Sequence, residues 1–341
     1  MSKLLTIVVP TYNMEAYLNR CLDSLLVSDE QMQLLEVLVI NDGSKDNSSA
    51  IAHEYEEKYP NTFRVIDKEN GNYGSCINRG LKEAMGKYIK VLDADDWFDT
   101  TVFAEFITIL QNSNADLIIS DFSEVDENGN ITKEHKYKID NSEKIDKNPQ
   151  LFDMWMHAVT YKTNNLRLIN YQQTEGISYT DQEWIFHPMV TIKSIKGFEK
   201  SLYQYLVGRA GQTVDMNVWH RNMSHEIKTL KNRILLLASI TDYGFAKNYL
   251  LARLEGGTLL VYKRALLYFC DNSIVELDQF IRENDRSLYD FLETSDARRD
   301  ISYKFVKHWH RTSYNVSMVY FMYKLLRIIY AIKNKISWIN S

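Results

Sequence analysis

Residues 87–98 read Lys-Tyr-Ile-Lys-Val-Leu-Asp-Ala-Asp-Asp-Trp-Phe, an apolar strand pattern that ends abruptly in Asp93, Asp95 and Asp96. Carboxylates a few Å apart repel one another and raise each other's pKa, so such a cluster usually persists because a cation neutralises it. Mg²⁺ and Mn²⁺ prefer oxygen ligands and are often held by one or two carboxylates together with substrate phosphates. The stretch therefore predicts a metal and phosphate site at the end of a buried strand.

Strand and helix patterns alternate through the first third of the chain. The expected strands are Leu4–Val9, Val37–Ile40, Phe63–Ile66, Tyr88–Leu92 and Leu117–Ile119. The segments between them carry helical stripes, with apolar residues at i, i+3, i+4 and i+7. This alternation predicts an α/β fold with right-handed crossovers and a mostly parallel sheet. Ligands bind outside the carboxyl ends of strands in such sheets, so the chemistry is expected just after Val9, Ile40 and Leu92.

The length of the chain, 341 residues, favours two domains over one. Helical patterns dominate from residue 217 onwards, so we expect an α/β domain over 1–215 and a helical domain over 216–341. The formal net charge of −5 argues against a general nucleic-acid binder. The three widely spaced cysteines indicate neither a disulfide framework nor a zinc site, and they fit a reducing cytoplasm. Because no run of 18 apolar residues occurs, no ordinary transmembrane helix is expected.

The loop after the first expected strand, Pro10-Thr11-Tyr12-Asn13, contains no glycine. A dinucleotide-binding turn needs glycines so that the backbone can approach the pyrophosphate, and this loop therefore argues against such a site. Tyr12 either stacks on a nucleotide base or is an ordinary loop aromatic. Asp42, at the end of the second strand, either accepts a hydrogen bond from a uracil N–H or belongs to a turn that leads into a capped helix.

Four motifs together resemble family 2 glycosyltransferases, the inverting enzymes with the GT-A fold. The motifs are Thr6–Asn13, Val37–Ser44, Asn70–Gly80 and Val91–Trp97, in the order and spacing of that family. The match is strong over residues 1–110 and continues more weakly to residue 214. One departure is Ile77, where the family often has an arginine, and this leaves phosphate contacts from that helix open. The resemblance implies a GT-A fold and a catalytic domain over 1–215.

The resemblance also implies how the nucleotide is bound. Thr11, Tyr12 and Asp42 would contact the nucleotide, and Asp42 would read a uracil base. The expected donor is therefore a nucleotide sugar, most simply a UDP-sugar.

The aspartate cluster takes narrower roles from the same resemblance. Asp93 would contact the ribose or the metal, and Asp95 would ligate a Mn²⁺ or Mg²⁺ ion that bridges the diphosphate. Asp96 would contact the donor or the acceptor, unless it only caps the turn before Trp97. A metal suits this reaction because it neutralises the charge that grows on a diphosphate leaving group without proton transfer.

An inverting transfer needs a general base that deprotonates the acceptor hydroxyl on the face opposite the leaving group. The best candidate is Asp181, in the segment Ile177–Trp184. Thr180 and Glu183 fit a capping box, which would place Asp181 in the first turn of a helix, where it could merely complement the helix dipole. The family commonly presents its base in an acidic pair before an aromatic helix, which favours Asp181 and leaves Glu183 as the alternative.

The segment 203–213 resembles the part of the family that closes the active site. Arg209 and Gln212 would there contact the diphosphate or close a lid, since the planar guanidinium of arginine suits phosphate. The alternative is that Arg209 is an ordinary solvent-exposed side chain.

The C-terminal stretch 301–341 contains seven lysines and arginines and no acidic residue. Its apolar and aromatic residues with a narrow basic stripe are typical of a helix that lies in a membrane interface. We therefore expect contact with an anionic membrane surface, each nearby basic residue adding about 1 kcal/mol. The alternative is a terminal helix packed on its own domain with snorkelling basic side chains.

The sequence thus predicts a cytoplasmic, peripheral, metal-dependent inverting glycosyltransferase that acts on a glycan or lipid-linked acceptor. One alternative is a sugar nucleotidyltransferase, which would require glycines and a basic residue after Val9. The other is a non-catalytic module that binds a nucleotide sugar or glycan but lacks a working base.

Overall fold

The computed structural model describes residues 2–140, 145–148, 151–209, 216–268 and 273–294, with isolated positions between 310 and 329. The chain divides into two compact units. Residues 1–212 and 242–250 form the first unit, and residues 213–241 and 251–341 form the second. The predicted division of roles between 1–215 and 216–341 stays a prediction.

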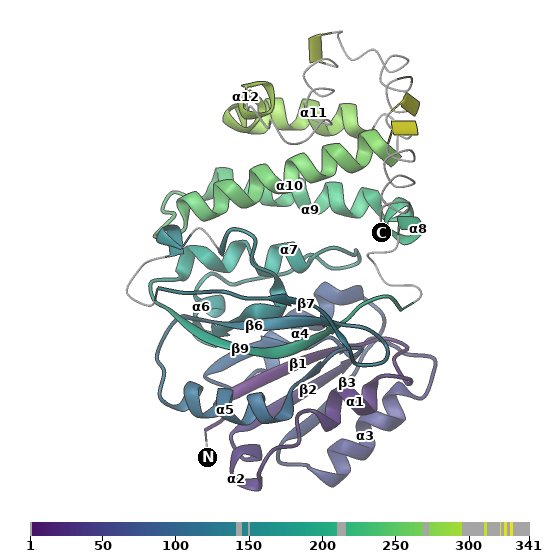
Figure 1. The fold of residues 1–341 in the computed structure, drawn as a ribbon, viewed down its shortest axis with the longest axis vertical. Coiled ribbons are helices and arrows are strands. Elements are labelled where there is room, and N and C mark those ends of the chain that lie inside the picture. The colour runs from purple at the N-terminus through teal and green to yellow at the C-terminus, as the bar shows by residue number, and fades with distance from the viewer. Residues whose placement is uncertain are drawn as a thin grey trace. The chain divides into compact units, whose positions relative to one another are not determined.

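The described strands of the first unit form one mixed sheet of nine strands (Figure 1). The strands are β1 (Leu5–Thr11), β2 (Leu35–Asn41), β3 (Phe63–Asp67), β4 (Tyr88–Val91), β5 (Trp97–Phe98), β6 (Leu117–Val125), β7 (Ile131–His135), β8 (Val159–Lys162) and β9 (Ile195–Leu206). Their order is β3-β2-β1-β4-β8-β6-β9-β5, and β7 pairs with β6. The first four strands in this order are parallel, as predicted. β8 runs antiparallel to both of its neighbours, which makes the sheet mixed.

Short helices and 3-10 turns connect these strands. They are α1 (Leu18–Asp23), α2 (Asp29–Met32), α3 (Ser48–Lys58), α4 (Asn72–Glu83), α5 (Thr100–Gln111), η1 (Ile145–Lys147), η3 (Met156–Ala158), α6 (Thr163–Leu168), α7 (Asp181–Trp184) and η4 (His187–Thr191). Asp99 caps α5 by accepting a hydrogen bond from the Val102 N–H at 2.9 Å. The apolar face of α5 packs on β9, where the rings of Phe106 and Phe198 are 5.2 Å apart.

The strand predicted at Leu117–Ile119 continues to Val125, because β9 pairs with its whole length. The Asp126 N–H then donates to the Asn130 carbonyl at 3.0 Å and closes a turn into β7. Residues 126–130 therefore connect β6 and β7 as a hairpin.

The register of the parallel strands brings the predicted loops to one edge of the sheet. Thr11 at the end of β1 lies beside Asn41 at the end of β2. Val8 on β1 lies beside Val91 on β4, two residues before Asp93. The loops that contain Tyr12, Asp42 and Asp93 consequently start from the same carboxyl edge.

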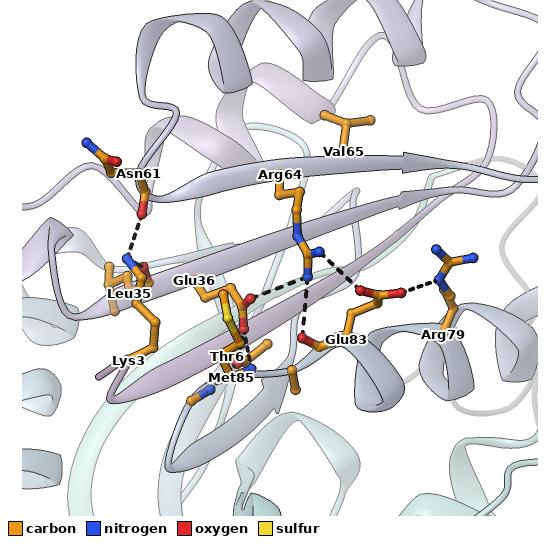
Figure 2. Close-up of polar contacts among 12 residues, drawn as sticks. Lys3, Thr6, Leu35, Glu36, Asn61, Arg64, Val65, Arg79, Glu83 and Met85 are labelled. Carbon is orange, nitrogen blue, oxygen red and sulfur yellow. Dashed lines mark hydrogen bonds and ion pairs between the residues drawn. The ribbon is translucent and has the colours of Figure 1, made fainter. Parts of the chain in front are cut away.

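The opposite edge of the sheet is held by a network around the buried carboxylate of Glu36 (Figure 2). Glu36 Oε2 accepts hydrogen bonds from the Thr6 hydroxyl at 2.6 Å and from the Met85 N–H at 2.7 Å. Arg64 on β3 pairs with Glu36 at 3.5 Å and with Glu83 at 3.0 Å. These contacts join β1, β2, β3 and the end of α4 far from the aspartate loop.

The described part of the second unit is helical. Its helices are α8 (Met216–Arg221), α9 (Met223–Ser239), α10 (Lys247–Tyr268, whose first residues belong to the first unit), α11 (Ser273–Asn284) and α12 (Arg286–Thr294). The carboxylate of Asp278 is fully buried and accepts a 2.6 Å hydrogen bond from the Tyr262 hydroxyl. Among the described residues, no helix combines the length and the apolar character needed to cross a bilayer. The basic stretch 301–341 lies almost entirely outside the described residues.

Candidate active site

The loop after β4 holds the aspartate cluster that the sequence predicts. Oδ1 of Asp93 accepts a hydrogen bond from the Tyr73 hydroxyl at 3.0 Å. Burial and the neighbouring charge of Asp95 raise the pKa of Asp93 to about 7, and the charge of Asp181 acts in the same direction. Asp181, which is distant in sequence, therefore lies close to the cluster. Such accumulated negative charge favours a cationic partner.

Asp96 is buried, and protein groups bind both of its carboxylate oxygens. Oδ2 accepts a hydrogen bond from the Tyr203 hydroxyl at 2.6 Å, and Oδ1 accepts one from the Leu206 N–H at 2.8 Å. The Tyr203 hydroxyl in turn accepts from the Asp93 N–H at 3.1 Å. Asp96 thereby ties the aspartate loop to β9, and its predicted contact with donor or acceptor stays a prediction.

Asp95 forms an ion pair across the site. Its Oδ2 lies 2.7 Å from Nε of Arg209, and both side chains are largely buried. The Arg209 guanidinium also lies 5.5 Å from the ring centroid of Tyr17. Arg209 is therefore held in the site, which contradicts the alternative of an ordinary solvent-exposed arginine. Gln212 lies outside the described residues.

Arg20 on α1 also supports the aspartate loop. Its guanidinium stacks on Trp97, 3.7 Å from the ring centroid, and its NH2 group donates to the Asp95 carbonyl at 3.2 Å. This contact fixes the backbone of the loop, because a stacked and hydrogen-bonded guanidinium has little freedom.

Asp181 opens the short helix α7, two residues after a strained residue. Tyr179 has φ of 63°, a left-handed conformation that bulky residues rarely adopt and that often marks functional sites. The predicted capping box is wrong, because the Thr180 hydroxyl accepts from Gln173 at 2.9 Å and forms no cap bond. Glu183 accepts from both the N–H and the hydroxyl of Thr174 at 2.8 Å. Glu183 is thus a buried structural acceptor, whereas Asp181 is partly exposed.

The third sequence motif positions the chain that leads to Asp181. The Asn78 side chain exchanges two hydrogen bonds with the backbone of Gln173, at 2.8 and 2.9 Å. A Cβ on Gly74 would meet the Thr174 carbonyl oxygen at 2.0 Å, so only glycine permits this approach. In the structure, helix α4, which contains Gly74 and Asn78, therefore supports residues 173–174.

The three predicted nucleotide-binding residues lie at the ends of β1 and β2. Thr11 is buried and its hydroxyl donates to the Val9 carbonyl at 3.1 Å, while the Tyr12 side chain is 46% exposed. Asp42 is buried, forms an ion pair with Lys68 and accepts from the Gly71 N–H at 2.9 Å. Oδ1 of Asp42 makes both of these contacts.

A second group of potential metal ligands appears beside the predicted one. One ligand atom from each of Asp93, Asp96 and His157 lies within 4.8 Å of the others. His157 is buried, its Nδ1 has no hydrogen-bond partner, and burial lowers its pKa to about 3, with a further contribution from Lys90. A neutral imidazole with two carboxylates is a fitting donor set for Mn²⁺. Asp95, the predicted ligand, is paired instead with Arg209.

Sequence reasoning missed several residues of the site. Tyr73 reads as part of a helical apolar stripe, and Tyr203 sits in a strand whose pairing with the aspartate loop is non-local. His157 belongs to no motif. Lys68, which pairs with Asp42, was also missed. Its position directly after the third strand, at the same edge of the sheet as Asp42, was the signal that could have identified it.

The family model for glycosyl transferase family 2 matches residues 6–185. The chain belongs to this family. Among curated relatives, this family 2 chain is 39% identical over 121 residues to the uncharacterized glycosyltransferase MG025 homolog of Mycoplasma pneumoniae, which is 35% of this chain and 39% of that protein. It is 26% identical over 249 residues to the glycosyltransferase GlyA of Streptococcus pneumoniae, covering 69% of this chain and 35% of GlyA. These matches thus span little more than a third of either relative's length.

Solved structures show the fold of this family 2 chain. S. aureus TarS residues 1–349, in complex with UDP-GlcNAc, matches with a TM-score of 0.70 at 16% identity and covers 91% of this chain and 92% of that one. The Pyrobaculum calidifontis mannosyltransferase PcManGT, in complex with GDP-Man and Mn²⁺, matches with a TM-score of 0.52 at 14% identity, over 91% of this chain and 88% of that one. The predicted GT-A fold, with a helical C-terminal part, is confirmed.

Proposed function

We propose that this family 2 chain transfers a sugar from a UDP-sugar to a hydroxyl group of a glycan or lipid-linked acceptor, with inversion at the anomeric carbon. The observation that carries the proposal is the meeting of Asp181 with the aspartate loop. Burial, followed by the negative charges of Asp96, Asp93, Asp95 and Asp181, raises the pKa of Tyr205, so all four carboxylates lie near this one phenol. A base and a cation-binding cluster on one site are what glycosyl transfer to a hydroxyl requires.

Asp181 is proposed as the general base. It is partly exposed and close to the cluster, and its Oδ2 accepts a hydrogen bond from the side chain of Gln182 at 3.0 Å. In the reaction, the acceptor oxygen forms a bond to the anomeric carbon while the bond to the diphosphate oxygen breaks. Asp181 takes the proton of the acceptor hydroxyl. Glu183 is less suited, since Thr174 already occupies both of its oxygens.

A divalent ion, Mn²⁺ or Mg²⁺, is proposed as the cofactor. Asp93 and Asp95 would hold it, and His157 with Asp96 offers further ligand atoms on the same side. When bound, the ion would neutralise the charge that develops on the diphosphate. Arg209 would leave Asp95 and contact the diphosphate through its guanidinium. Gln212 is proposed to contact the diphosphate as well. Asp96 is proposed to act mainly by holding the loop through Tyr203.

UDP is the preferred nucleotide for two reasons. Asp42 lies beside the ends of β1 and β2, where Thr11 and the exposed ring of Tyr12 would contact a base in this proposal. The TarS structure contains UDP-GlcNAc, which makes a UDP-sugar the first donor to test here. GDP-mannose, present in the PcManGT structure, is the second.

Donor turnover tests the proposal. Purified full-length protein is incubated with UDP- and GDP-sugars, with Mn²⁺, Mg²⁺ or EDTA, and release of the nucleoside diphosphate is measured. We expect metal-dependent release from a UDP-sugar and an inverted anomeric configuration in the product by NMR. Release that is equal with EDTA, or a product with retained configuration, would contradict the mechanism.

The basic stretch 301–341 is proposed to contact an anionic membrane at the cytoplasmic face. Support comes from its seven basic residues without an acidic one. Flotation with phosphatidylglycerol vesicles should recover the full chain, and phosphatidylcholine vesicles should not. Recovery that does not depend on lipid charge would contradict this proposal.

A further inference from the structure

Aromatic rings form a continuous platform beside the aspartate loop. The platform consists of Phe122 on β6, His135 on β7, Trp155 and His157 around η3, and Tyr205 on β9. Phe122 stacks on His135 with centroids 4.2 Å apart, and His157 stacks on Tyr205 at 4.5 Å. Neither the four sequence motifs nor the proposed donor site accounts for Phe122, His135 and Trp155.

Trp155 is the exposed member of the platform. It lies 5.1 Å from His135 and 5.8 Å from Phe122 between ring centroids, yet 39% of its surface is exposed. The Tyr137 hydroxyl accepts a hydrogen bond from the backbone N–H of Trp155 at 3.3 Å, which fixes the main chain there. The indole itself is held by its contacts with the rings of His135 and Phe122, so it is positioned before any ligand binds, which lowers the entropic cost of binding.

The platform leads directly into the reaction centre. The Trp155 centroid is 5.9 Å from that of His157, which lies against the carboxylates of Asp93 and Asp96. The buried ammonium of Lys90 donates to the carbonyls of His157 and Val159 at 2.7 and 3.2 Å. Lys90 thus fixes this segment from within the sheet.

Sheet topology separates this platform from the nucleotide. The loops with Tyr12 and Asp42 follow β1 and β2, on one side of β4 in the strand order. The platform comes mainly from β6, β7 and β9, on the other side. The carboxylates between the two regions disfavour a phosphate on the platform unless a cation accompanies it. The ligand that fits is uncharged.

We propose that Trp155 and its neighbouring rings bind a pyranose ring of the acceptor, with the apolar C–H face of the sugar on the indole. A sugar ring has apolar faces and a polar rim, and aromatic side chains with polar tips match both. The hydroxyl of Tyr205 supplies such a polar tip, whereas Nε2 of His135 is paired with Glu124 at 2.7 Å. The inference rests on the proposed glycosyl transfer and assigns the acceptor subsite within it.

The test uses binding, so that it is separate from donor turnover. Saturation-transfer NMR is recorded for the full-length protein with UDP and Mn²⁺ and the methyl pyranosides of glucose, galactose, mannose and N-acetylglucosamine. We expect at least one pyranoside to bind. Trp155→Ala should weaken its binding about tenfold or more, Trp155→Phe should keep most of it, and the UDP dissociation constant should change less than twofold.

Leu168→Ala is the matched control, because Leu168 is 70% exposed on α6 and makes no part of the platform. It should bind the pyranoside like wild type. A second readout uses the wild-type side chain. The NMR signal of the Trp155 indole N–H, assigned by its loss in Trp155→Phe, should shift when the pyranoside is added and should not shift with UDP alone.

Three outcomes would overturn the inference. They are the absence of pyranoside binding to wild type, equal binding by wild type and Trp155→Ala, and weaker UDP binding by Trp155→Ala, which would place the nucleotide base on the indole. Failure of donor turnover alone would contradict the proposed function while leaving these binding results readable.

Discussion

Nε of Arg209 lies 2.7 Å from Oδ2 of Asp95, so an arginine occupies the carboxylate that we propose for the metal. A cation already paired with that oxygen competes with a divalent ion. We expect Arg209→Gln to bind Mn²⁺ several-fold more tightly without donor. The same change should lower kcat/KM for the donor about 10- to 100-fold, because a charged contact to the diphosphate is lost.

Calorimetry with Mn²⁺ and initial rates measure these opposite effects. Arg286→Gln is the control, since Arg286 pairs with Asp290 at 3.0 Å on an exposed face of α12. Unchanged Mn²⁺ affinity in Arg209→Gln would show that Asp95 is not a metal ligand.

Asp181→Asn should lower kcat about 10²- to 10⁴-fold, the range typical of a lost general base. The dissociation constant for UDP should stay within twofold, since the nucleotide loops are elsewhere. Glu183→Gln should mainly reduce stability, because it replaces one of the two oxygens that accept from Thr174 with an NH2 group. Pre-steady-state rates of sugar transfer distinguish Asp181 from Glu183 as the general base. If Glu183→Gln abolishes transfer and Asp181→Asn does not, the base is Glu183.

Tyr203→Phe should destabilise the fold by about 1–3 kcal/mol, because it leaves the buried Asp96 oxygen and the Asp93 N–H without a partner. Activity should also fall, since the aspartate loop loses its tie to β9. Tyr262→Phe removes an equally short 2.6 Å hydrogen bond to a buried aspartate of the second unit. Urea unfolding should show similar losses for both variants, and only Tyr203→Phe should raise the KM for the metal.

Glu36→Ala should cost about 2–3 kcal/mol of stability, because the Thr6 hydroxyl and the Met85 N–H lose their buried acceptor. This network, drawn in Figure 2, lies near the amino ends of β1 and β2, whereas the site lies at the carboxyl ends of the parallel strands. The affinity for UDP at a temperature where the variant is folded should therefore match wild type. A loss of UDP affinity in folded Glu36→Ala would contradict the separation of the two edges.

The buried side chain of Lys90 should make the folding stability of the protein change with pH between pH 7 and pH 10. Burial lowers its pKa to about 7, whereas an unfolded lysine titrates near 10.4. Between these values the unfolded state binds more protons, so folding stability contributed by this site rises with pH. Relative to Lys90→Met, wild type should gain stability from pH 7 to pH 10. Urea unfolding of both proteins across this range measures it, and parallel curves would contradict the burial of a titrating ammonium.

Much of the first unit could be predicted because its signals are local. The strand runs at 37–40, 63–66 and 88–92 are apolar and end in polar loops, and the structure places strands at all three. The extension of β6 to Val125 could not be predicted, because those polar residues become strand only through pairing with β9. Likewise, Thr180 and Glu183 match a capping box by spacing, but Gln173 and Thr174 compete successfully for their side chains.

The sequence by itself determined the family, the parallel order of the first strands and the presence of an aspartate cluster at a strand end. These follow from short-range patterns, in which hydrophobic period and loop chemistry lie within a few residues. Only the tertiary structure decided which carboxylates act together. The charge of Asp181 raises the pKa of Asp93, so the two lie in one site, whereas Asp96 is bound to Tyr203 and Asp95 is paired with Arg209, 114 residues further along the chain. Such contacts arise when separate strands and helices pack, and local sequence does not encode those distances.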